Sequence, residues 1–227
     1  MKKMLVIIFI LLIIFIGIYI NKKNIGNETV TATEVNNIEE YISKIYMWQE
    51  ITEEALPKFN NINDAPDLWL WEVVKKNLDD YEVSYDEIEQ KAKEIFGQEF
   101  NKQFPKEGTE YIQYNEELKK YVATGVGLDT LDDSFFIKQI TKTKNGYEVE
   151  IAEYLEDYEN SMNIEDENQV YDIYIKDLNH NIIATIKSND GETKSIEVVK
   201  ENIDKFTTKK IILEKDKKEN LYVRQVG

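Results

Sequence analysis

The sequence contains no cysteine, and this absence excludes several kinds of chemistry. It rules out a structural disulfide, a thiolate metal centre, a cysteine nucleophile and a lipid-modified N-terminal cysteine. A single histidine, His180, excludes a metal site built from several imidazoles and a relay of histidines. His180 lies between two asparagines in a predicted turn, which is typical of a solvated residue.

Positive charge is also scarce. The chain has 28 Lys and Arg residues against 44 Asp and Glu residues, for a formal net charge of −16. A surface this acidic repels phosphate backbones, so nucleic-acid binding is not expected. The sequence lacks a Gly-x-Ser-x-Gly motif, a phosphate-binding loop and a dinucleotide fingerprint. It therefore nominates no catalytic residue and no cofactor.

One long hydrophobic run is present at residues 4–20, with two lysines on each side. As a helix the run spans about 26 Å, close to the thickness of the hydrocarbon core of a bilayer. It is longer than the apolar region of a signal peptide and ends in bulky residues rather than the small ones of a cleavage site. We therefore expect residues 1–22 to form an uncleaved single-pass anchor in membrane lipid, with a cleaved signal peptide as the alternative. The short leading segment favours an extracytoplasmic location for the rest of the chain.

Three amphipathic helices are predicted after this run. Residues 23–36 are polar and aperiodic, which indicates a linker. Apolar residues then recur at three- and four-residue spacing over 37–56, over 66–80 and from Ser84 or Asp86 onward. Ser84 and Glu87 have the spacing of a capping box, and Asp64 is the candidate cap before Pro66.

The second of these helices carries Trp69 and Trp71. Residues two apart cannot share one face of a helix, so we expect one indole in the core and the other half-exposed or packed on the first helix. A carbohydrate-stacking role for this pair is the alternative to core packing.

After Gly108 the hydrophobic period changes to two, which is typical of strands. The predicted hairpins pair residues 111–114 with 121–128, 135–143 with 146–155, 170–176 with 182–187, and 211–215 with 221–226, with a short helix over 196–206. Strand 146–155 alternates apolar and polar residues, which indicates a sheet with one solvated face. Its predicted inward side chains are Tyr147, Val149, Ile151 and Leu155, and its predicted outward ones are Glu148, Glu150, Tyr154 and Glu156.

Helices that precede strands indicate an α+β fold: a transmembrane helix, then three helices packed on a curved antiparallel sheet in one domain over residues 37–227. This order resembles NTF2-like and cystatin-like folds, whose N-terminal helices pack into the concavity of an antiparallel sheet. The segments Lys93-Glu-Ile-Phe-Gly97, Phe104-Pro-Lys-Glu-Gly108 and Gly146-Tyr-Glu-Val-Glu-Ile-Ala152 resemble an uncharacterised group of membrane-anchored extracytoplasmic proteins from AT-rich bacteria. That resemblance implies no particular activity.

Two clusters of acids are candidate sites. The segment 153–167 is rich in carboxylates and could offer a weak cation site formed by Asp157, Glu159, Glu165, Asp166 and Glu167. The spacing of a calcium-binding loop is missing, which favours a solvated connection. Asp129, Asp132 and Asp133 follow Gly125 and Gly127, and could serve acid–base catalysis if one of them were buried. The adjacent Thr130 and Ser134 favour a turn with exposed carboxylates.

These observations favour a non-enzymatic, membrane-tethered extracytoplasmic domain that binds another envelope protein or a cell-wall component. The alternative is an NTF2-like pocket domain that binds or hydrolyses a small ligand. A third possibility, a membrane-spanning regulator, is disfavoured because residues 1–3 are too short for a cytoplasmic segment.

Overall fold

The computed structural model describes residues 29–47, 49–78, 80, 82–123, 131–159, 161, 169–190 and 192–227. The predicted anchor and the first part of the predicted linker lie outside these residues, as do Gly125, Gly127, Asp129, Glu165, Asp166 and Glu167. Within the described ranges, no helix combines the length and the apolar character needed to cross a bilayer.

The N-terminal half is helical, as predicted, but its first helix is shorter and begins earlier. Helix α2 covers Ala32–Ile45 and a separate short helix α3 covers Gln49–Thr52, so the predicted helix 37–56 is wrong in its bounds. Thr31 and Glu34 form a capping box at the start of α2, so the last residues of the predicted linker belong to the helix. The helix ends at Tyr46, whose backbone is extended and whose hydroxyl reaches Glu153 in a strand far along the chain.

Two further helices follow. The short 3₁₀ helix η1 (Ile62–Asp64) precedes α4 (Asp67–Lys76), so Asp64 is not the cap of α4 as predicted; Pro66 occupies that position. Helix α5 covers Tyr85–Phe96, and the predicted capping box of Ser84 and Glu87 is confirmed. Gly97 ends α5 with φ at +93°, a conformation that favours glycine.

The strands form two antiparallel sheets, and the four predicted hairpins are present, although residues 124–128 of the first one lie outside the described residues. The small sheet has the order β1-β4-β3-β2, with β1 Glu82–Val83, β2 Gly108–Thr109, β3 Ile112–Asn115 and β4 Lys120–Ala123. The large sheet has the order β10-β9-β6-β7-β8, with β5 paired to the other side of β6. Its strands are β5 Leu131–Lys142, β6 Gly146–Asp157, β7 Asp172–Lys176, β8 Ile182–Lys187, β9 Thr207–Lys215 and β10 Leu221–Val226.

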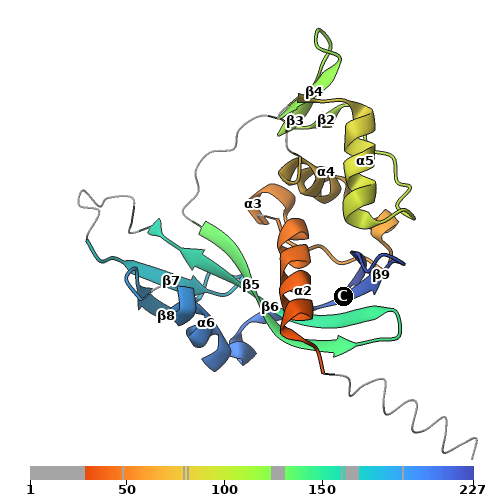
Figure 1. The fold of residues 1–227 in the computed structure, drawn as a ribbon. Coiled ribbons are helices and arrows are strands. Elements are labelled where there is room, and N and C mark those ends of the chain that lie inside the picture. Colours follow the sequence, from red (N-terminus) through yellow and green to blue (C-terminus); the bar gives the residue numbers. More distant parts are fainter. Residues whose placement is uncertain are drawn as a thin grey trace, which may run out of the picture.

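The predicted short helix 196–206 is present between β8 and β9 with different bounds: α6 covers Glu192–Glu201, and the 3₁₀ turn η3 covers Ile203–Lys205. In Figure 1, α4, α5 and the small sheet form the upper part of the domain, whereas α6 lies beside β7 and β8 at the lower left. The α+β class is therefore confirmed. The arrangement of three helices on one curved sheet is not, because the described elements include α6 and a second sheet.

Strand β6 separates two hydrophobic cores. The larger core joins α2, α4 and α5 to Tyr147, Val149 and Ile151 on one face of β6. The smaller core packs Val199 of α6 and Phe206 against the opposite face of the sheet. Tyr154 belongs to this smaller core, with its ring 6.0 Å from that of Phe206. The prediction of a solvated face is therefore wrong for the C-terminal part of β6, because α6 covers it.

Helix α4 lies inside the larger core and is buried on nearly all sides. Trp69 is 0% exposed and Trp71 is 1% exposed, so neither indole is half-exposed. The Trp69 indole instead donates a hydrogen bond to the Ala55 carbonyl at 3.2 Å, within the segment predicted as the first helix. Trp69 contacts Phe59 and Phe96, whereas Trp71 contacts Phe104 and Tyr121 on the side of the small sheet. A helix with partners on opposite sides can bury both residues of an i, i+2 pair.

The early start of α2 gives a testable prediction. The Thr31 hydroxyl accepts a hydrogen bond from the Glu34 amide at 3.2 Å, and the Glu34 carboxylate accepts one from the Thr31 amide at 2.8 Å. Thr31→Ala should therefore lower the free energy of unfolding by about 1 kcal/mol in urea titrations. Thr29→Ala, an exposed position before the helix, is the matched control and should leave it unchanged. Equal stabilities for the two variants would mean that α2 begins later.

Candidate functional site

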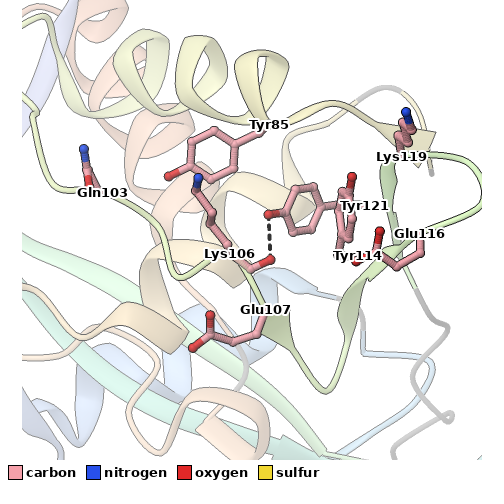
Figure 2. Close-up of a pocket in the computed structure, with 8 residues that line it drawn as sticks. All are labelled: Tyr85, Gln103, Lys106, Glu107, Tyr114, Glu116, Lys119 and Tyr121. Carbon is pink, nitrogen blue, oxygen red and sulfur yellow. Dashed lines mark hydrogen bonds between the residues drawn. The ribbon is translucent and has the colours of Figure 1, made fainter.

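A cavity of about 840 Å³ lies between the start of α5, the loop after Phe100 and the β3–β4 hairpin. Figure 2 shows the side chains around it. The lining residues come from all three of these elements, and they are Tyr85, Gln103, Lys106, Glu107, Tyr114, Glu116, Lys119 and Tyr121. Three of them are tyrosines, so the cavity has aromatic walls with polar groups around them.

Hydrogen bonds from two tyrosines fix the walls of this cavity. The Tyr85 hydroxyl donates to the backbone carbonyl of Phe104 at 3.0 Å, and the Tyr121 hydroxyl donates to that of Lys106 at 2.7 Å. Both bonds tie the loop between α5 and the small sheet to the elements on either side of it. The loop therefore has a defined position without regular secondary structure of its own.

The rings form a continuous aromatic cluster. Tyr121 is buried, and its ring centroid lies 5.2 Å from that of Tyr114 and 6.1 Å from that of Tyr85. Behind it, the Trp71 ring of α4 lies 5.3 Å away and links the cluster to the main core. Tyr114 is 39% exposed, so its ring is available to a ligand, whereas Tyr121 supports it from below.

The chemistry of the lining favours binding. Burial raises the pKa of the Tyr85 and Tyr121 hydroxyls, so both remain protonated at neutral pH and serve as hydrogen-bond donors rather than bases. The lining contains two lysines and two glutamates, which gives a locally neutral site in a chain with a net charge of −16. A neutral, polar ligand with an apolar face suits these walls better than a polyanion does.

The predicted cation site is not assembled among the described residues. Asp157 is buried and forms an ion pair with Lys176 of β7, and it also accepts a hydrogen bond from the Glu159 amide at 2.8 Å. Glu159 is exposed, and Glu165, Asp166 and Glu167 lie outside the described part of the chain. No group of three or more Asp, Glu or His side chains placed to hold a metal ion occurs in the described ranges.

The other sequence candidates have separate surroundings. His180 is exposed in the β7–β8 turn with φ at +63°, which agrees with a solvated residue. Asp133 accepts a hydrogen bond from the Gln49 amide at 2.8 Å, whereas Asp132 is exposed. The acid–base hypothesis required one of these acids to be buried; Asp133 is half-buried, Asp132 is not buried, and Asp129 lies outside the described residues.

A buried ionic cluster was missed in the sequence. Glu153 of β6 is 0% exposed and lies 3.3 Å from the ammonium group of Lys209, which is 5% exposed. Lys209 also contacts Glu54 at 3.1 Å and the carbonyl of Leu56, and the Tyr46 hydroxyl donates to Glu153 at 3.3 Å. Burial raises the pKa of Glu153, and burial and the charge of Glu153 raise that of Tyr46. The one available signal was the position of Glu153 between Ile151 and Leu155 on the inward face.

This cluster has a structural role. It holds the connection after α2 against the strands β6 and β9, and its members are not among the residues that line the cavity.

Comparisons with protein-family models, curated proteins and solved structures find no match to this chain. The tyrosine-lined cavity is therefore the candidate site on the strength of its own geometry.

The surroundings of Asp157 give the second prediction. Asp157→Asn should lower the free energy of unfolding by about 2 kcal/mol, because Lys176 loses its counter-charge in a largely buried site. Glu159→Gln should change it by less than about 0.5 kcal/mol, because Glu159 is exposed. Thermal melts in sodium and calcium chloride at equal ionic strength should give the same midpoint for the wild type. A midpoint increase specific to calcium that Asp157→Asn removes would instead support the cation site.

Proposed function

We propose that this chain is a non-enzymatic, membrane-tethered extracytoplasmic domain that binds a saccharide component of the cell wall in its tyrosine-lined cavity. The observation that carries the proposal is the exposed ring of Tyr114, supported by Tyr121 and surrounded by polar side chains. The tether is the hydrophobic run 4–20, whose length and flanking lysines support a single-pass anchor.

The geometry of the cavity supports a sugar ligand for two reasons. The C–H groups on one face of a pyranose carry partial positive charge and are attracted to the negative face of an aromatic ring. The hydroxyls at the edge of the sugar need donors and acceptors, which Gln103, Lys106 and Glu107 supply from the loop. A small number of polar groups around an aromatic wall is the usual pattern of a ligand pocket.

A hydrolytic pocket is the competing function, because Glu107 and Glu116 both line the cavity and glycosidases use carboxyl pairs. Both residues are exposed, whereas such a pair needs at least one group shielded from water. Binding without turnover is therefore the function that this geometry supports best.

The tether gives the third prediction. The full-length chain should fractionate with membranes and should stay there in high salt and alkaline carbonate, because a spanning helix is held by the hydrophobic effect rather than by surface charge. A variant without residues 4–20 is the control and should appear in the supernatant. Recovery of a shortened form that lacks the first twenty or so residues would support the cleaved signal peptide instead.

The saccharide site gives the fourth prediction. The full chain in mild detergent should co-sediment with purified bacterial cell walls, and Tyr114→Ala should weaken this binding about fivefold, as expected for one lost stacking contact of about 1 kcal/mol. Tyr174→Ala, a half-buried tyrosine on β7 in the other sheet, is the matched control and should bind as the wild type does. Equal binding of the two variants would remove the cavity as the site. Release of soluble sugar that Glu107→Gln or Glu116→Gln abolishes would establish the hydrolytic alternative.

A further inference from the structure

Strand β5 is an edge of the large sheet. It pairs with β6 from Leu131 to Lys142, and in the described part of the chain no strand pairs with its other side. Unpaired amide and carbonyl groups along an edge strand are a template for another strand. The Tyr46 hydroxyl donates a hydrogen bond to the Ser134 carbonyl of this strand at 3.2 Å. A carbonyl oxygen has two lone pairs and can accept a second hydrogen bond.

A groove of about 440 Å³ follows this edge. Its walls are Val35 of α2 on one side and Ile196 of α6 on the other, with Phe135, Phe136 and Ile137 of β5 between them. These three side chains are only partly buried, although each is packed against one of the two cores. A groove between helices and an open strand edge suits an extended segment, because main-chain hydrogen bonds give affinity and alternate side chains enter apolar pockets.

The charges on β5 restrict which strand can pair with it. Asp132 and Asp133 lie at its beginning and Lys138 and Lys142 lie further along, so the strand is neutral in a chain with a net charge of −16. Lys138 is exposed and lies at the bulge between Ile137 and Gln139, a feature that commonly prevents indiscriminate pairing of edges. In an antiparallel pair of identical strands, however, the acidic beginning of each strand faces the basic part of the other.

We propose that the β5 edge pairs antiparallel with β5 of a second copy of this chain. The two-fold axis passes at Phe135, so that Asp132 of each copy lies opposite Lys138 of the other. Both residues are exposed, and Lys138 has its own partner, Glu150, at 2.8 Å on β6. Asp132 of the second copy adds to that ion pair. A two-fold axis makes one surface its own partner, which is the commonest arrangement of homodimers.

The position of the groove supports a second copy as the occupant. Val30, the second residue described, also lines it. Seven residues, 23–29, separate Val30 from the proposed anchor at residues 1–22, so the two are at most about 30 Å apart. Two copies in one membrane would therefore hold their β5 edges at the same height above it. The argument from equal height above the membrane rests on the proposed anchor, whereas the argument from the charges of β5 does not.

Charge reversal in the full chain tests the dimer. The wild type in mild detergent should sediment as a dimer at micromolar concentration. Asp132→Lys and Lys138→Glu should each weaken the dimer about tenfold, since each replaces two attractive cross-strand pairs by repulsive ones. The double variant restores opposite charges in the same register and should dimerise within about threefold of the wild type.

The control is Lys187→Glu, which breaks an ion pair with Asp172 between β7 and β8, away from the β5 edge. It should dimerise as the wild type does, and thermal melts should show that every variant is folded. A monomeric wild type at 100 μM, single variants that dimerise normally, or a double variant no better than the single ones would each overturn the proposal. Failure of the carbonate test would remove the tether but leave this result unaffected, because sedimentation reports the dimer and extraction reports the anchor.

Discussion

The burial of helix α4 is the constraint on which the upper part of the domain depends. Trp69 and Trp71 lie on different sides of this helix, and each is enclosed by aromatic residues from other elements. Glu72 is also fully buried, and it is neutralised by Lys75 at 2.6 Å and bonded by the Thr109 hydroxyl at 3.1 Å. A helix that is buried on nearly all sides requires α2, α5 and the small sheet to be in place around it. The same packing fixes one wall of the candidate site, because the Trp71 ring contacts the Tyr121 ring.

Strand β6 has the corresponding role in the lower part. It pairs with β5, β7 and β9, and each of its faces belongs to a different core. Its inward face carries the buried Glu153, whose desolvation is costly unless a cation and a hydrogen-bond donor are close. Lys209 and Tyr46 supply both, so this costly group also fixes where the chain after α2 meets the sheet.

The two surfaces proposed for binding share an electrostatic property. The tyrosine-lined cavity and strand β5 each carry equal numbers of acidic and basic residues, although the chain as a whole is strongly acidic. Like charges repel over about a Debye length of 8 Å in physiological salt, so locally neutral patches are where a ligand or a second copy can approach at least cost. The remaining acidic surface disfavours non-specific association through charge repulsion.

Local sequence signals determined the features that local physics controls. The two-residue period of the strands and the Ser84–Glu87 capping box each involve neighbours in the chain, and the strands and the start of α5 follow from them. The α+β class follows in turn from the order of these elements. The Thr31–Glu34 capping box was equally present in the sequence, but the polar composition around it indicated a linker.

Tertiary contacts decided the rest. The first helix ends at Ile45, and the Tyr46 hydroxyl that follows donates to Glu153, more than a hundred residues away, a contact that no local pattern reports. The outer face of β6 is dry only because α6 folds over it, and both tryptophans are buried only because α4 has neighbours on opposite sides. The cavity joins Tyr85, Lys106 and Tyr121 from separate elements. The hydrophobic period of a segment indicates which of its residues share one face. Whether that face is buried depends on which other elements pack against it in the tertiary structure.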